Sequence, residues 1–185
     1  MPFGERYETV LAGARAGAEW AWAEIYRDLS PDVLGYLRGR GAAEPEDLLG
    51  QVFLDVVRGL GRFEGTERDL RSWIFTIAHH DLLDERRRRR RHPVEPAPTE
   101  GIPDRRPGGD VEVEALGVLG AGRVRRVLER LSPDQRDVLA LRIFGDLTIE
   151  QVARVIGKSP GAVKALQRRG LARASKVLTR EGVPL

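Results

Sequence analysis

Apolar residues recur three and four positions apart along most of the chain, and this spacing predicts helices throughout. The alternation of apolar and polar residues that marks a half-buried strand is weak everywhere. We therefore predict an all-α protein. The pattern places helices over residues 18–28, 31–38, 45–59, 70–91, 124–131, 133–144, 148–156 and 160–178.

Serine–proline pairs predict where several of these helices begin. Ser30-Pro31, Ser132-Pro133 and Ser159-Pro160 each offer a capping hydroxyl followed by proline at the first helical position. Ser132 with Gln135, and Thr148 with Gln151, have the three-residue spacing of a capping box. Three of the predicted helices in the last third of the chain therefore have a sequence-encoded start.

A segment rich in proline and glycine divides the chain. His92 to Asp110 holds five Pro and three Gly in nineteen residues. Proline blocks helix formation, so this segment is expected to be extended and flexible. We therefore predict two small helical domains, at residues 5–91 and 112–180, joined by a flexible linker at 92–111.

Composition excludes several classes of protein. The chain has no cysteine, so a disulfide framework and a thiolate metal site are excluded. It has three histidines, and no run of about 18 apolar residues that would predict a membrane span. The first residues lack the apolar segment of a secretion signal. We expect a cytoplasmic protein with no metal and no cofactor, and no nucleophile–base pair suggests an enzyme.

The charge is placed unevenly along the chain. Residues 1–78 carry nine Arg and thirteen Asp/Glu, whereas Thr148 to Arg180 carry eight Lys/Arg and one acid, a net of +7. The whole chain is only +3. A second basic zone is the run Arg86–Arg91. Two basic zones on an otherwise acidic body are typical of a protein that contacts nucleic acid.

The last forty residues have the pattern of a helix-turn-helix. A short capped helix ends at the turn Gly157-Lys158, and a capped basic helix follows. Such a second helix can enter a DNA major groove, where Lys and Arg reach guanine or phosphates and Gln pairs with adenine. The alternative is a solvated basic face on a three-helix bundle. The candidate DNA-contacting residues are Ser159, Gly161, Ala162, Lys164, Gln167, Arg168, Arg169 and Arg173.

The helix before the linker changes from apolar to basic. The run Arg86–Arg91 carries more positive charge than is needed to balance the negative end of a helix dipole. We therefore favour contact with phosphates over a frayed helix end. Trp73 fits a core position better than a base-stacking one. His79 and His80 point about 100° apart on a helix, so they are unsuited to bind one metal and are candidate polar DNA contacts.

The order of these elements resembles the extracytoplasmic-function (group IV) sigma factors of bacterial RNA polymerase, within the sigma-70 family. The resemblance covers about residues 20–178. The segments that carry it are Ala21–Tyr26, Asp47–Leu49 with Phe53-Leu54, Leu70–Ala78, Leu131–Arg136 and Gly145–Ala153.

The resemblance implies roles for the candidate residues. The last helix would read the promoter −35 element, and the Arg62–Ser72 segment with the helix behind it would recognise and open the −10 element. The C-terminal domain would also touch the β-flap of the polymerase, and the helix after Pro45 would dock on the β′ clamp helices. The implied −10 residues are Arg62, Arg68, Arg71, Ser72, Trp73, His79, His80, Arg86 and Arg87. The implied polymerase contacts are Asp47, Gln51, Phe53 and Asp55, with Phe53 also a candidate for the core.

Two positions depart from the family's usual sequence. Gly50-Gln51 stands where Gln-Glu is common, so a carboxylate that would face the polymerase is absent. The recognition helix reads Ala162–Gln167 where Thr-Val-Lys-Ser-Arg is commoner. These departures affect the strength of polymerase docking and the −35 preference.

We therefore predict a promoter-specificity subunit that is not an enzyme. Its expected partners are core RNA polymerase, promoter DNA and an anti-sigma factor, and it is expected to be a monomer when free of them. Two alternatives remain: a stand-alone helix-turn-helix regulator, which would dimerise on a palindrome, and a sigma-like decoy that sequesters an anti-sigma factor.

Overall fold

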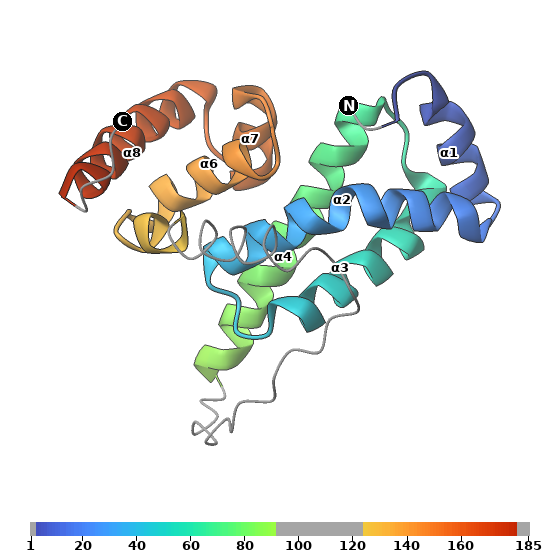
Figure 1. Ribbon diagram of the computed structural model, residues 1–185, viewed down its shortest axis with the longest axis horizontal. Helices are drawn as coiled ribbons and strands as arrows, with labels where there is room; N and C mark the ends of the chain where they lie inside the picture. Colours follow the sequence, from blue (N-terminus) through green and yellow to red (C-terminus); the bar gives the residue numbers. More distant parts are fainter. Residues whose placement is uncertain (1–2, 92–123, 181–185) are drawn as a thin grey trace, which may run out of the picture.

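The computed structural model describes residues 3–91 and 124–180, and every regular element in these two ranges is helical (Figure 1). The prediction of an all-α protein is confirmed. The predicted linker lies outside the described residues. The elements are η1 (Gly4–Arg6), α1 (Tyr7–Arg15), α2 (Glu19–Arg40), α3 (Pro45–Gly59), η2 (Leu60–Arg62), α4 (Glu67–Arg91), α6 (Pro133–Ile143), α7 (Ile149–Ile156) and α8 (Pro160–Arg180). Residues 124–129 are also helical.

Helices α2, α3 and α4 pack on one another and form the core of the N-terminal half. Their apolar faces follow the predicted three-and-four spacing, so each helix buries one stripe. The buried side chains at the centre of this bundle are Ile25, Val33, Leu37, Val52, Val56, Ile74, Phe75 and Leu82.

Helix α2 runs unbroken through Pro31, so the predicted start of a new helix at Ser30-Pro31 is wrong. An interior proline removes one helical hydrogen bond and costs about 3 kcal/mol. Leu29 and Val33, on either side of it, are both buried in the bundle. The free energy gained by burying Leu29 and Val33 in one continuous helix outweighs the cost of the interior proline.

Two features of the N-terminal half were not predicted. One is the short helix α1, which packs on α2 and touches η2. The other is the early start of α4. Thr66 and Asp69 cap that start reciprocally: the Asp69 carboxylate accepts from the Thr66 backbone at 3.0 Å, and the Thr66 hydroxyl accepts from the Asp69 N–H at 3.3 Å. The predicted loop before this helix is therefore shorter than expected.

The caps predicted in the C-terminal half are confirmed. Ser132 with Gln135, and Thr148 with Gln151, form complete capping boxes at the starts of α6 and α7. The Ser159 hydroxyl accepts from the Ala162 N–H at 3.2 Å at the start of α8. Helix α8 packs against both α6 and α7.

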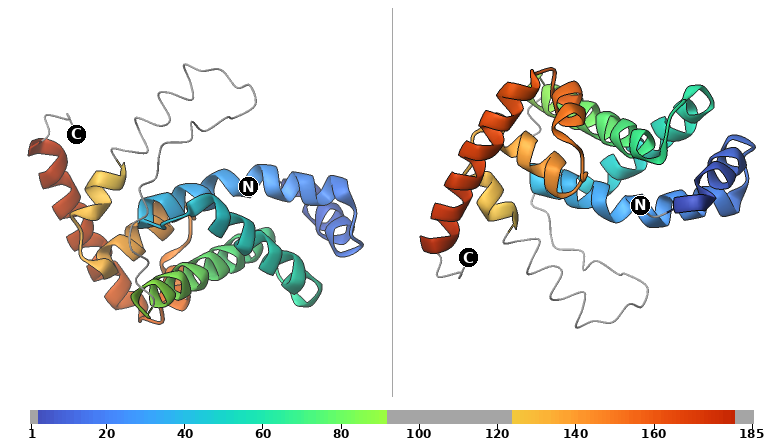
Figure 2. Two further views of the ribbon diagram at one scale, coloured as in Figure 1. Left: turned by 90° about the horizontal axis from the view of Figure 1, so that it is seen from below. Right: turned by 90° about the horizontal axis from the view of Figure 1, so that it is seen from above.

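The two halves of the molecule touch directly. Helix α2 packs on α6, and α4 packs on α7. The Phe144 ring lies against Gly35 and Gly39 of α2, and a Cβ added at Gly35 would stand only 2.9 Å from it. In all three views α1 and α8 lie at opposite ends of the molecule (Figures 1 and 2).

Four large apolar residues that continue the three-and-four spacing of their helices, and were expected to be buried for that reason, are exposed. Tyr26 is 47% exposed, Val57 51%, Ile143 56% and Leu171 51%. The predicted apolar stripes were too wide, because a helix packed on two neighbours does not bury its whole apolar arc.

Candidate nucleic-acid interface

Helices α7 and α8 are joined by a tight turn of defined geometry. Gly157 adopts the left-handed conformation, with φ of +65°, and ends α7. The Lys158 N–H then donates to the Ala153 carbonyl at 3.0 Å. Glycine has no Cβ and adopts this conformation at little cost, so Gly157 determines where the turn forms. The predicted helix-turn-helix is confirmed.

The basic side chains of α8 are free to meet a polyanion. Lys164, Arg168, Arg169 and Arg173 are all exposed, as are Ser159 and Gly161 at the tip. Ala162 and Gln167 are half-buried, and the Oε1 atom of Gln167 is buried with no hydrogen-bond partner among the described residues. The structure thus brings all eight predicted −35 residues onto one helix and its cap.

Arg169 and Arg173 also line a basic hollow beside the start of α6. Arg130 and Lys176 complete its positive lining, and its volume is about 780 Å³. Sequence reasoning did not include Arg130 or Lys176. Arg130 and α8 line the same hollow, although they lie some forty positions apart in the sequence.

The predicted −10 residues differ in their exposure, and three of them, Arg71, Trp73 and Arg86, are half-buried. Arg62, Arg68, His80 and Arg87 are exposed, whereas Ser72 and His79 are buried. Trp73 is half-buried and stacks on Phe63 at 5.1 Å between ring centroids. A Cβ at Gly59 would stand 2.7 Å from the Trp73 ring, so this indole is wedged between α3 and the loop.

Arg71 bridges the two halves of the molecule. Its Nε atom donates to the Gly145 carbonyl at 2.6 Å, and its guanidinium also donates to the Phe144 carbonyl at 2.9 Å. The same guanidinium pairs with Asp32 at 2.5 Å. Close by, the Gln151 side-chain amide donates to the Arg68 carbonyl at 3.2 Å. A residue predicted to face DNA is therefore engaged by the C-terminal half.

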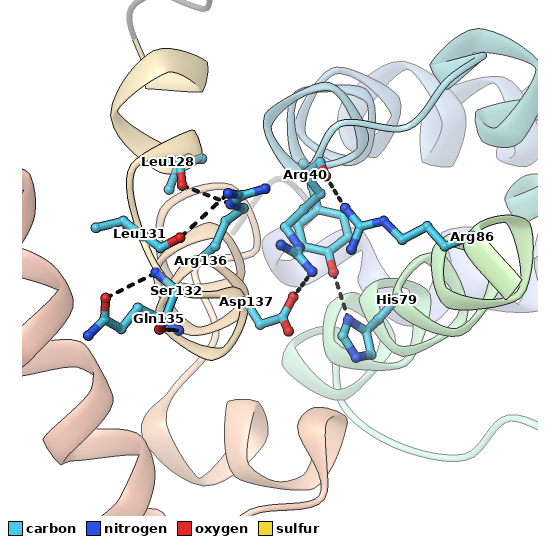
Figure 3. A network of polar contacts seen from close by, with 10 residues as sticks. Arg40, His79, Arg86, Leu128, Leu131, Ser132, Gln135, Arg136 and Asp137 are labelled. Atoms are coloured by element: carbon cyan, nitrogen blue, oxygen red, sulfur yellow. Dashed lines mark hydrogen bonds and ion pairs between the residues drawn. The ribbon is translucent and has the colours of Figure 1, made fainter. Parts of the chain in front are cut away.

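A second polar network links α2, α4 and α6 (Figure 3). Arg40, only 1% exposed, forms an ion pair with Asp137, and Arg86 donates to the Arg40 carbonyl. Burial raises the pKa of Asp137, although the charges of Arg40 and Arg86 oppose the rise. Burial also lowers the pKa of Arg86. Arg86 thus differs from Arg88–Arg91, which are exposed at the end of α4.

His79 lies inside this region as a neutral imidazole. Its Nδ1 atom shares a hydrogen bond of 2.8 Å with the Tyr36 hydroxyl. Burial, followed by the charges of Arg40, His80 and Arg86, lowers the pKa of His79 to about 4. Burial likewise raises the pKa of Tyr36. In this arrangement the predicted DNA contact by His79 is covered, and His80 is the exposed member of the pair.

The predicted polymerase contacts lie along α3. Asp47 and Gln51 are exposed, and the Gln51 amide donates to Asp55 at 2.9 Å. That bond, followed by Arg58, lowers the pKa of Asp55. Phe53 is 7% exposed and packs edge-on against Tyr26, so its ring belongs to the core.

Sequence reasoning missed one member of this face. Leu54 is 53% exposed and lies at helical spacing from Asp47, Gln51 and Arg58. Leu54 therefore adds an exposed apolar side chain to the polar side chains of this face. The signal was the position of Leu54 outside the apolar stripe of α3.

Within residues 3–91 and 124–180, no three His, Cys, Asp or Glu side chains are grouped so as to hold a metal ion. None of the described helices is long and apolar enough to cross a membrane.

Comparison with known proteins identifies the class. The family model described as Sigma-70 region 2 matches residues 25–92, and that described as Sigma-70, region 4 matches residues 121–173. The chain belongs to the sigma-70 family, whose members confer promoter-specific transcription initiation and are not a class of enzyme.

Relatives place it in the ECF group of that family. The ECF RNA polymerase sigma factor ShbA of Streptomyces griseus is 33% identical over 181 residues, covering 90% of this chain and 94% of that protein. SigD of Mycobacterium tuberculosis is 31% identical over 188 residues, covering 97% and 87%. The structure of CnrH in complex with the cytosolic domain of CnrY shares the fold, with a TM-score of 0.67 at 20% identity over 95% of this chain and 99% of that one.

Proposed function

We propose that this protein directs core RNA polymerase to promoters, with α8 reading the −35 element and the α3–α4 region recognising the −10 element. The observation that carries the proposal is the exposed basic α8 behind its glycine turn, on the same chain as a region 2 bundle. The protein works in the cytoplasm, uses no cofactor and catalyses no reaction itself.

The −35 element is read as duplex. The tip of α8 combines small residues, Gly161 and Ala162, with Lys164 and Gln167 one turn further on. Small residues allow the backbone to approach the groove, and longer ones reach base edges. Arg168 and Arg173 hold the phosphates on either side.

The −10 element is recognised at the exposed residues of the α3–α4 loop and along α4. Arg62 and Arg68 flank the loop, and Arg87–Arg91 extend the positive surface to the end of the helix. A base that leaves the duplex loses its stacking energy, and contacts with the protein must replace that energy. A loop of fixed conformation is suited to provide these contacts. Ser72, Trp73 and His79 support this surface from beneath.

Core polymerase docks on the exposed face of α3. Leu54 supplies an apolar contact, and Asp47, Gln51 and Arg58 surround it with polar groups. A buried apolar anchor inside a polar rim is the usual plan of a protein interface. The β′ clamp helices are the expected partner for this face, and the β-flap for the C-terminal domain.

The arrangement in which α2 packs on α6 is the idle one. Elements centred about 25 base pairs apart lie roughly 85 Å apart along B-DNA, whereas a compact chain of this length has a radius of gyration of about 16 Å. We propose that the domains at 5–91 and 112–180 separate on the 92–111 linker when the polymerase binds. An anti-sigma factor would act by holding the idle form; a solved structure that shares the fold, that of the sigma factor RpoE from Bartonella quintana, contains a bound anti-sigma factor, NepR.

Run-off transcription tests the proposal. Purified core polymerase is incubated with genomic promoter fragments, with and without this protein. Transcripts that need the protein and begin at defined sites support the proposal, and their start sites reveal the two promoter elements. Absence of transcripts together with absence of core binding refutes it. A stable dimer that binds an inverted repeat without polymerase would instead identify a stand-alone regulator, and tight anti-sigma binding without transcription a decoy.

A further inference from the structure

The N-terminal segment holds the loop between η2 and α4 by its backbone. The Tyr7 hydroxyl donates to the Gly65 carbonyl at 2.9 Å, and the Arg15 guanidinium donates to the Phe63 carbonyl. Tyr7 and Phe63 are both buried. Two carbonyls of a four-residue loop are thus fixed by one short helix, α1.

The contact is reciprocal, because the chain beyond the loop also holds the N-terminal segment. The carboxylate of Glu67, 8% exposed, accepts the backbone N–H of Phe3 at 3.0 Å and that of Gly4 at 3.1 Å. The Phe3 side chain is buried as well. A buried carboxylate with two backbone donors is a costly group to leave unpaired, so the segment is firmly attached.

Anchoring fixes the backbone while leaving other side chains of the loop free. Phe63 points inward and stacks on Trp73, whereas Arg62, Glu64 and Thr66 are exposed. Gly65 sits at φ of +149°, where other residues are strained. The loop therefore presents a rigid outer edge rather than an adaptable one.

We infer that residues 3–15 hold the loop of the −10 recognition surface in its binding conformation, with Tyr7, Arg15 and Glu67 as positioning residues. This inference rests on the proposed function of the loop. A rigid loop binds an unstacked base without first losing its own conformational freedom, so anchoring raises affinity and sharpens base preference. The region 2 family model matches only from residue 25, so the family pattern does not include this segment.

The test compares holoenzymes carrying the wild-type protein, Tyr7→Phe, Arg15→Gln, or both changes. Tyr7→Phe removes one hydroxyl and keeps the buried ring. The probe is a fork-junction DNA whose −10 element is single-stranded, with each −10 base varied in turn. Core affinity and −35 duplex affinity are measured on the same preparations. The matched control is Tyr26→Phe, since that ring packs on Phe53 and not on the loop.

Each single change is expected to weaken binding to the fork junction about three- to tenfold, the worth of one hydrogen bond, and to flatten the base preference. Core affinity, −35 affinity and thermal midpoint should change little, and the control should match the wild type. Unchanged fork affinity and base preference in the folded double variant would overturn the inference. Failure of the wild-type holoenzyme to bind the fork junction would instead count against the proposed function.

Discussion

Replacing Asp137 by Asn should release the two halves of the molecule from each other. The ion pair between Arg40 and Asp137 joins α2 to α6, and Arg40 is almost wholly buried at that contact. Asparagine has the same shape as aspartate but no charge. The change therefore leaves the Arg40 guanidinium buried without a counter-charge for as long as the halves stay together.

The size of the effect follows from burial. Removing one partner of a buried ion pair destabilises by about 3 to 5 kcal/mol. The Asn carbonyl still offers a dipole to Arg40, so we take the lower end, about 3 kcal/mol. When the halves separate, Arg40 regains water and the penalty vanishes. The equilibrium between closed and open forms should thus shift toward the open form by roughly a hundredfold.

Distances between spin labels measure this shift directly. The chain has no cysteine, so two introduced cysteines carry the labels without background. Ala12 on α1 and Ala172 on α8 are exposed, and these two helices lie at opposite ends of the molecule. The wild type should give a narrow distance distribution, and Asp137→Asn a broad and longer one.

Asp134→Asn is the matched control in the same helix. Asp134 pairs with Lys158 at 3.1 Å within the C-terminal half, and both side chains are partly exposed. Such a pair contributes at most about 1 kcal/mol, and its loss should leave the distance distribution unchanged. If Asp137→Asn also leaves distances and unfolding free energy unchanged, the argument that the buried charge holds the halves together is refuted.

Two further predictions concern single side chains. Burial lowers the pKa of His79 to about 4 from its ordinary 6.5, so the unfolded chain binds a proton that the folded chain does not. The free energy of unfolding should therefore fall by about 3 kcal/mol as pH drops from 6.5 to 4. Chemical denaturation at several pH values measures this fall. The free energy of unfolding should depend less on pH in His79→Gln, and as in the wild type in the exposed His80→Gln. Replacing Arg168 and Arg169 by Ala should weaken −35 duplex binding and reduce the slope of log affinity against log salt concentration by about 2. Arg27→Ala on α2 is the control and should change neither. A slope equal to that of the wild type would place both arginines off the DNA.

Local signals predicted most of the C-terminal half. The capping boxes at Ser132 and Thr148, the glycine turn at Gly157 and the cap at Ser159 all depend on residues within four positions of one another. Such contacts need only neighbouring residues, so local sequence predicts where these helices begin and end unless distant packing overrides it. The exposed basic face of α8 followed from the same spacing.

Structural features that depend on packing between distant residues were predicted wrongly or not at all. Ser30-Pro31 has the local chemistry of a helix start, yet burial of Leu29 and Val33 keeps α2 continuous. Helix α1 was missed although its buried residues Tyr7, Val10, Leu11 and Ala14 stand at helical spacing. Local spacing could not predict that Tyr7 and Arg15 bind loop carbonyls some fifty to sixty positions away.

The arginines show why residue type alone could not separate surface from interface. Arg71 and Arg86 had the same prediction as Arg62 and Arg87, because all four lie in or near the basic stretch that the family resemblance assigns to DNA. In the structure the first two donate to backbone carbonyls and the last two are exposed.

This division bears on how the closed form could be released. A guanidinium that donates to a carbonyl gains less than one that meets a phosphate, because a charged acceptor strengthens the bond. Arg71 is held at Phe144 and Gly145 by such carbonyl bonds, and by a half-exposed Asp32 within its own half. Separation of the halves would free Arg71 for DNA at small cost, whereas Arg40 would gain only water. We therefore expect promoter DNA to compete for Arg71, whereas Asp137 keeps the buried Arg40 paired for as long as the halves stay together.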